Sequence, residues 1–494
     1  MSVPFDATPI LRLVARRRIA ALRRMEAVAT QDALLARLLA RASATRFGRD
    51  HGFARLRGHA EFRRAVPLRR YEAMWDAYWR AGFPTLDNVS WPGRIPYMAL
   101  SSGTTSGRTK HVPVSRAMVA ANRGAALDVL AWHLENQPGA KPLAGPGFML
   151  GGSTDLVGLA PGVRAGDLSG IAAVEVPRFL RAWNYPPPEI ALLPDWERKL
   201  ARITATAPPD ARILSGTPSW LLVLLERMAA TRGAVPLPAL ELLIHGGVAW
   251  APYRDRIAPF LPSGCATREV YAASEGFLAM ADRMDGQGMR LTLDRGVFHE
   301  FVPLEEIDAA EPTRLTLDRV ELGVDYAIAV TTCAGLFAYL LGDVVRFVSR
   351  EPPRVLMVGR VSDMLSTFGE HVTGEEIAAA LDGVPWREYM VGAVFDSAIG
   401  RHCWIIETEA AVDAALLDAR LSAANDDYRA HREGGQLAAP EVALVPKGSF
   451  EDWMRSIGKG GGQHKVPRVV ADPARFEGFR QALLSRAARG PPHC

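Results

Sequence analysis

The pattern of apolar and polar residues changes along the chain. Over the first hundred residues, apolar positions recur at helical spacing, as in Leu34, Leu35, Leu38 and Leu39. From about residue 146, short apolar runs broken by Gly and Pro alternate with amphipathic segments. This alternation predicts a helical start followed by an α/β region with a mainly parallel sheet.

Within the α/β region, we expect a helix over 218–230 and the following short strands: 148–150, 211–214, 242–244 and 269–271. Residues 297–347 are rich in strand-forming residues. Residues 326–342 contain no charge, but a membrane-spanning helix needs about 20 apolar residues. Because Cys333-Ala334-Gly335 interrupts this run, we predict two buried strands joined by a tight turn.

A change in pattern divides the chain into two domains. Pro352-Pro353 and an apolar run ending at Gly359-Arg360 precede a region of mixed α+β pattern. We therefore expect a large domain over 1–358 and a smaller α+β domain over 359–494.

Composition and charge narrow the function. The 494 residues are 48% apolar and 23% charged, which is typical of a soluble globular protein. The net charge of +4 favours neither nucleic acid nor a membrane as partner. Four separated cysteines without a CxxC pair exclude a disulfide scaffold and a zinc ribbon, and are typical of the cytoplasm.

The basic N-terminal segment has two interpretations. Residues 1–50 contain ten Arg and four acidic residues, a bias typical of an organelle transit peptide. The helical pattern nevertheless continues through the leucines at 34–39, so we favour helices docked on the fold.

A loop rich in hydroxyl side chains and glycine is the strongest chemical signal. It reads Ser101-Ser102-Gly103-Thr104-Thr105-Ser106-Gly107-Arg108-Thr109-Lys110, and Val112-Pro113 follow. Glycines permit backbone N–H groups to turn toward one anion, and Lys110 adds a positive charge. It is not a Walker A loop, because Arg-Thr-Lys follows Gly107. On composition alone, an exposed linker is the competing interpretation.

This loop resembles the phosphate loop of adenylate-forming enzymes, in the form used by the GH3 acyl-acid amido synthetases. Segment 271–276 (Tyr-Ala-Ala-Ser-Glu-Gly) resembles their second motif, and segment 335–345 resembles the third. Further similar patches lie, in order, at 51–53, 66–72, 166–170, 246–248, 425–428 and 463–468. Because the ordered set runs along most of the chain, the chain is identified as similar to the GH3 family.

The resemblance implies an adenylate-forming fold: a large N-terminal domain with β-sheets flanked by helices, and a smaller mobile C-terminal lid beyond a hinge at Gly359-Arg360. It implies ATP and Mg²⁺ as cofactors and Lys465 as the catalytic residue. The nucleotide-binding residues are expected to be Ser101, Ser102, Gly103, Thr104, Thr105, Gly107, Lys110, Gly246, Gly247, Tyr271, Ala273, Ser274, Glu275, Asp343 and Arg360.

Several of these residues suit their implied roles chemically. Glu275 could hold Mg²⁺, which binds one or two carboxylates plus phosphate oxygens. Asp343 follows an apolar run and a glycine, so its carboxylate could emerge at a strand end and accept the ribose hydroxyls; a turn-forming Asp is equally compatible. Gly246-Gly247 could admit the base or form an ordinary loop, and His245 is expected to be packed or solvated. Lys465 follows Gly460-Gly461-Gly462, so a closing loop could deliver its charge.

The expected function is ATP-dependent adenylation of a carboxylic acid, followed by acyl transfer to an amino-acid amine, by a monomer. The alternative is an acyl-CoA ligase with a thiol acceptor. A nucleic-acid-binding module is the third hypothesis, and the small net charge argues against it. Two departures concern the acceptor: the family usually has Tyr-Arg-Tyr-Arg where this chain has Phe337-Ala338-Tyr339-Leu340, and often Tyr where it has His464.

Overall fold

The computed structural model describes residues 3–102, 109–151, 156–193, 195–248, 250–284, 286–307, 309–361, 364–365, 367, 370, 372–395, 400–433, 437–457 and 466–487. Two compact units make up the chain. The described residues of 1–102, 108–341 and 345–357 belong to the first unit, and those of 342–344 and 358–494 belong to the second.

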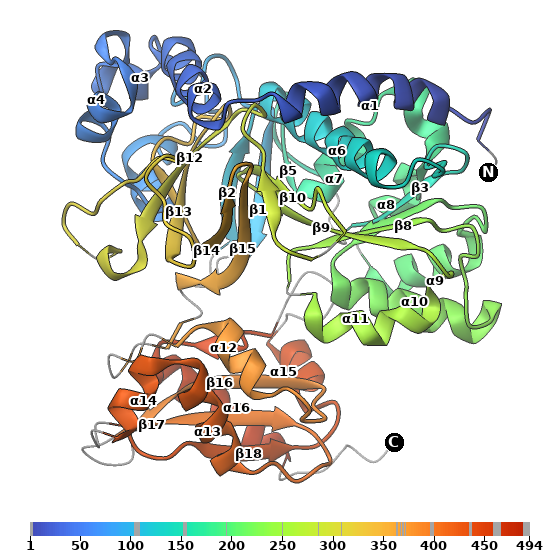
Figure 1. Cartoon of the computed structure of the whole chain (residues 1–494), viewed down its shortest axis with the longest axis vertical. Coiled ribbons are helices and arrows are strands. Elements are labelled where there is room, and N and C mark those ends of the chain that lie inside the picture. Colours follow the sequence, from blue (N-terminus) through green and yellow to red (C-terminus); the bar gives the residue numbers. More distant parts are fainter. Residues whose placement is uncertain are drawn as a thin grey trace. The chain divides into compact units, whose positions relative to one another are not determined.

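The first unit begins with helices, as predicted. They are α1 (Thr8–Arg23), α2 (Ala27–Ala42), α3 (Arg46–Asp50), η1 (Phe53–Arg55), α4 (Gly58–Ala65), α5 (Tyr71–Met74) and η2 (Trp75–Trp79). Helix α1 packs along α6 (Arg116–Asn136) and buries Leu11, Ala15, Ile19 and Leu22 (Figure 1). The arginine-rich segment is therefore a docked helix, as its apolar spacing predicted.

The largest sheet of the described residues has eleven strands. Their order is β12 (Val297–Pro303), β13 (Asp325–Thr332), β14 (Tyr339–Arg350), β15 (Pro353–Arg360), β11 (Met289–Leu291), β10 (Gly276–Met280), β9 (Ala266–Ala273), β8 (Leu242–Gly246), β7 (Ile213–Gly216), β3 (Gly147–Leu150) and β6 (Asn184–Tyr185). Strands β6, β3, β7, β8 and β9 are parallel, whereas β10–β9, β10–β11, β11–β15 and β12–β13 pair antiparallel. The predicted parallel sheet is correct for residues 147–273, and the whole sheet is mixed.

Helices cover the parallel strands on both faces. Figure 1 shows α1 and α6 on one side of β8 and β9, and α10 (Pro218–Arg232) and α11 (Ala251–Ile257) on the other. The remaining helices of this unit are α7 (Leu168–Val174), η3 (Arg178–Trp183), α8 (Pro188–Ala191), α9 (Trp196–Thr206), η4 (Ala258–Phe260) and η5 (Leu304–Glu306). Strands β13 and β14 are the two buried strands predicted for residues 326–342.

A smaller sheet of the first unit has the order β2 (Thr109–Val114), β1 (Tyr97–Ser102), β5 (Val163–Gly166) and β4 (Val157–Ala160).

Buried charges attach α1 and α6 to the rest of the first unit. The Asp128 carboxylate on α6, with 4% of its side chain exposed, accepts paired hydrogen bonds from Arg18 (2.8 and 2.7 Å) and from Arg295 (2.9 and 2.7 Å). Arg18 also donates to Asp294. Two guanidinium groups and two carboxylates therefore neutralise each other.

The second unit is a mixed sheet with helices. Its strand order is β18 (Glu441–Val445), β17 (Gly400–Glu407), β16 (Glu388–Phe395) and β19 (Val469–Val470), and its helices are α12 (Gly374–Ala380), α13 (Ala414–Ala424), α14 (Asp426–Glu433), α15 (Ser449–Ser456) and α16 (Pro473–Ala487). In neither unit does a described helix have the length and apolar character needed to cross a membrane.

Candidate functional site

The hydroxyl-rich loop is the connection of a β-hairpin. Strands β1 and β2 pair antiparallel, with Ser101 opposite Lys110 and Ser102 opposite Thr109. The other predicted loop ligands, Gly103, Thr104, Thr105 and Gly107, lie outside the described residues. The pairing fixes both ends of the loop side by side and places Lys110 at its base.

Lys110 contacts the segment 66–72, which also belongs to the family resemblance. Its Nζ lies 3.7 Å from Glu72 Oε1 and 5.3 Å from the centre of the Tyr71 ring. The Tyr71 hydroxyl accepts a hydrogen bond of 2.8 Å from the backbone N–H of His111, the residue after Lys110. Burial raises the pKa of Tyr71, so its hydroxyl stays neutral beside this lysine.

The second motif forms a tight turn at the edge of the large sheet. Ala273 pairs with Gly276, so Ser274 and Glu275 are the two residues that connect β9 to β10. Tyr271 lies in β9 and is 7% exposed. This turn follows the carboxyl end of a parallel strand, the edge at which open α/β sheets bind ligands.

The Gly246-Gly247 pair ends the adjacent parallel strand β8. Gly246 lies opposite Val270, and a Cβ at Gly246 would be 2.1 Å from the Val270 carbonyl oxygen. Gly247 has φ of +82°, in the left-handed region that favours glycine. The fold itself therefore requires both glycines, and it brings them beside Tyr271.

His245, directly before these glycines, is packed. Its ring stacks on Trp250 with centroids 3.9 Å apart, and burial lowers its pKa to about 3. The structure gives it no catalytic role.

Tyr339, in the third motif, lies close to Glu275 of the second motif and to segment 66–72. It is 2% exposed, and burial, reinforced by the nearby Glu275, Glu72 and Tyr71, raises its pKa well above the usual value. The neutral phenol lies close to the Glu275 carboxylate. Lys110, Glu72, Tyr71, Tyr339 and Glu275 thus form one polar cluster in the first unit.

Backbone hydrogen bonds hold segment 66–72 against the third motif. The Arg69 N–H donates to the Ala338 carbonyl (3.0 Å), and the Leu340 N–H donates to the Arg69 carbonyl (2.9 Å). Ala338 and Leu340, which stand where the family usually has arginines, are buried at 0% and 7% exposure. The sequence-based site omitted Tyr71, Glu72 and Tyr339; the available signal was that each belongs to a family-like patch.

The predicted position of Asp343 is wrong, whereas its nucleotide-binding role stays a prediction. Asp343 does not emerge at a strand end but lies inside β14, after Gly342, whose φ is +86°. Asp343 is 5% exposed, and its carboxylate accepts a hydrogen bond of 2.9 Å from Nε of Arg360 in β15. A glycine in the left-handed conformation redirects the strand here, which sequence alone did not indicate. Lys465 lies outside the described residues.

The residues present are compatible with Mg²⁺. The described residues contain no group of three or more His, Cys, Asp and Glu placed to hold a metal ion. Mg²⁺ bound to a nucleotide commonly takes one or two carboxylates and completes its shell with phosphate oxygens and water. Glu275 lies in an incompletely buried turn close to Tyr339. It can supply one such carboxylate.

Comparisons with known proteins cover most of the chain. The GH3 family N-terminal domain matches residues 18–206, the GH3 family central domain residues 290–360, and the GH3 family C-terminal domain residues 372–474. The indole-3-acetic acid-amido synthetase GH3.8 of Oryza sativa subsp. indica is 30% identical over 280 residues, 50% of this chain and 46% of that protein. The jasmonoyl–L-amino acid synthetase JAR4 of Nicotiana attenuata is 28% identical over 35% of this chain and 33% of its own. These matches thus span half or less of either relative.

Solved structures establish the fold. The AtGH3.15 acyl acid amido synthetase in complex with 2,4-DB matches with a TM-score of 0.76, covering 98% of this chain and 97% of its own at 15% identity. The 2-hydroxyisobutyryl-CoA ligase in the postadenylation state with 2-HIB-AMP matches with a TM-score of 0.58, covering 92% and 91% at 16% identity. The fold is that of adenylate-forming ligases.

Proposed function

The chain belongs to the GH3 family, and from this premise we propose that it is an ATP-dependent acyl-acid amido synthetase. The observation that carries the proposal is the polar cluster around Tyr339. Three motifs far apart in sequence contribute to it: the base of the hydroxyl-rich loop, the Ser274–Glu275 turn and the third motif. A site that must hold ATP and act on its α-phosphate needs such convergence.

The proposed first step activates the acid. A carboxylate oxygen attacks the α-phosphorus of ATP, the bond to the β-phosphate oxygen breaks, and acyl-AMP and pyrophosphate form. A carboxylate alone is a poor acyl donor because oxide would have to leave, whereas AMP is a good leaving group. The second step is attack of an amino-acid nitrogen on the acyl carbon, with loss of AMP and of the amine proton.

We assign the nucleotide-binding roles as follows. The hairpin from Ser101 to Lys110 cradles the phosphates, and the Gly246-Gly247 edge with Tyr271, Ala273 and Ser274 receives the adenine. Glu275 would hold Mg²⁺, which neutralises phosphate charge when bound. The Tyr339 phenol, kept neutral by burial, orients the Glu275 carboxylate. Asp343 accepts the ribose hydroxyls, and its partner Arg360 keeps that carboxylate in place.

We propose that residues 1–358 form the adenylation domain and residues 359–494 the lid. Lys465, in the lid, would supply positive charge between the carboxylate and the α-phosphate, where charge develops during transfer. The enzyme is proposed to act as a monomer in the cytoplasm. Support for that compartment comes from Cys265, Cys333 and Cys403, which are free thiols.

ATP–pyrophosphate exchange over a panel of carboxylic acids tests the first step. Lys465→Ala should abolish exchange without unfolding the protein. Lys447→Ala, an exposed lysine of the same unit, is the matched control and should retain exchange. Unaltered exchange in Lys465→Ala would show that the lid lysine is wrongly assigned.

The acceptor is tested separately. With ATP and an accepted acid present, amino acids should accelerate AMP release and coenzyme A should not. The reverse outcome would identify an acyl-CoA ligase and reject the amide-forming proposal.

A further inference from the structure

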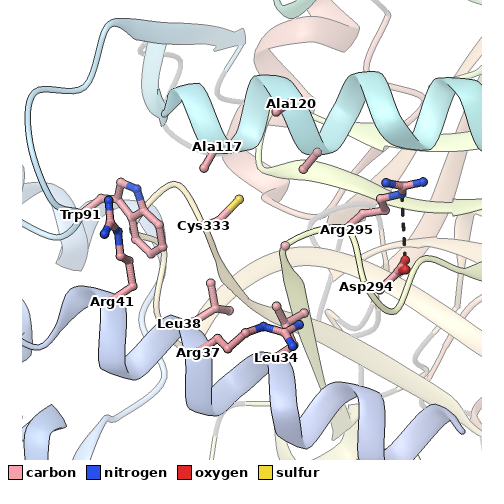
Figure 2. A pocket seen from close by; sticks show the side chains of 12 residues that line it. Leu34, Arg37, Leu38, Arg41, Trp91, Ala117, Ala120, Asp294, Arg295 and Cys333 are labelled. Atoms are coloured by element: carbon pink, nitrogen blue, oxygen red, sulfur yellow. Dashed lines mark ion pairs between the residues drawn. The ribbon is translucent and has the colours of Figure 1, made fainter. Parts of the chain in front are cut away.

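An open hollow of about 530 Å³ lies on the first unit, between α2, α6 and the turn from β13 to β14. Figure 2 shows α2 on one side, α6 with Ala117 and Ala120 on the other, and Cys333 between them. Leu38 and Trp91 add apolar surface. The volume falls in the range typical of small-molecule sites.

The uncompensated charge of this hollow is positive. Arg37 and Arg41 project from neighbouring turns of α2 and are exposed. Within the described part of the chain, neither side chain forms an ion pair or a hydrogen bond. Arg295 also lines the hollow, but it is neutralised by Asp128 and lies close to Asp294. Two arginines four residues apart on one helix can bind the same acidic group from two sides.

The hollow is separate from the candidate nucleotide site. Met118 and Val297 are fully buried between it and the turn at Glu275. A Cβ on Gly276 would lie 3.4 Å from Cε of Met118 and 2.9 Å from Cγ2 of Val297. Ala117 faces the hollow, so one layer of side chains divides the two places.

We propose that this hollow is a second ligand site, which binds a small amphipathic organic anion with an apolar body. The apolar body would contact Trp91, Leu38 and Ala120, and the acidic group would be held by Arg37 and Arg41. Guanidinium forks match carboxylate and sulfonate oxygens. The exposed Ala117 and Ala120, with the small accessible parts of Trp91 (8%) and Leu38 (3%), favour a ligand that also has an apolar part. The proposal concerns a site apart from adenylation and does not depend on it.

Isothermal titration of the full chain with naphthalene-2-sulfonate tests this site, since a sulfonate probe cannot form an acyl-adenylate. The wild-type protein should bind the probe with or without saturating ATP. Arg37→Ala/Arg41→Ala should weaken binding by roughly tenfold or more. Arg198→Ala/Arg202→Ala, an exposed pair with the same spacing on α9, makes the same charge change elsewhere and should bind like wild type.

A second variant tests the apolar half without altering charge. Ala120 is exposed on α6, so Ala120→Trp can fill the hollow while the helix remains folded, and it should abolish probe binding. Any of four results would overturn the proposal. The probe does not bind to the wild-type protein, or both arginine double variants lose the same affinity. Alternatively, ATP displaces the probe, or Ala120→Trp binds it unchanged. Loss of pyrophosphate exchange alone would leave the proposal standing, so its failure is distinguishable from failure of the adenylation function.

Discussion

Replacing Tyr339 by phenylalanine should slow adenylation while preserving the fold. The ring remains in its buried position, and the hydroxyl that lies close to the Glu275 carboxylate is lost. We propose that this hydroxyl donates to Glu275, and a hydrogen bond to a charged group contributes about 1.5–3 kcal/mol. Glu275 is incompletely buried, so water can replace part of the interaction, and the lower value of about 1.5 kcal/mol applies. This corresponds to roughly a tenfold fall in kcat/KM for ATP.

Pyrophosphate exchange at varied ATP measures this effect, and thermal unfolding checks that each variant folds. The matched control is Tyr326→Phe: Tyr326 is also 2% exposed, but its hydroxyl accepts a hydrogen bond from the Glu321 backbone. A double-mutant cycle of Tyr339→Phe with Glu275→Gln should give a coupling energy of about 1.5 kcal/mol. Equal losses in both tyrosine variants, or coupling near zero, would refute the orienting role of Tyr339.

Denaturant unfolding measures the free energy of unfolding that three further substitutions should change. Asp128→Asn should cost about 3 kcal/mol, because two guanidinium groups lose their shared buried carboxylate; a loss below about 1 kcal/mol would show that they are solvated. Burial lowers the pKa of His299 to about 3, against about 6.5 in the unfolded chain. The stability that the neutral ring contributes above pH 6.5 is therefore lost as pH falls. The loss is about 2 kcal/mol between pH 7 and pH 5. In His299→Gln, the free energy of unfolding should fall by about 2 kcal/mol less between pH 7 and pH 5. The same pH dependence in the variant and in the wild type would contradict a neutral, buried His299. Gly246→Ala should cost about 3 kcal/mol, because its Cβ would collide with the Val270 carbonyl, whereas Gly158→Ala, with open space around it, should cost far less; equal costs would contradict the close strand contact.

The local pattern of apolar and polar residues was sufficient to predict much of the fold. The apolar spacing of α2, the strand at β8 and the two buried strands β13 and β14 could all be predicted, because each depends on which face of one element is buried. The antiparallel half of the large sheet could not be predicted as one sheet with the parallel half. Which strands become neighbours depends on contacts between distant segments, and no local period encodes them.

The candidate site, like the fold, could be predicted from the sequence only in part. The sequence by itself determined which chemistry the chain carries: the hydroxyl-rich loop, Glu275 and Asp343 stand in an order that identifies the family. Only the tertiary structure decided that Tyr339 is the residue where three motifs meet, and that Arg360 pairs with Asp343 inside a strand. The order of motifs is a property of the linear amino-acid sequence. A neutral buried phenol beside a carboxylate exists only after distant strands have packed and excluded water.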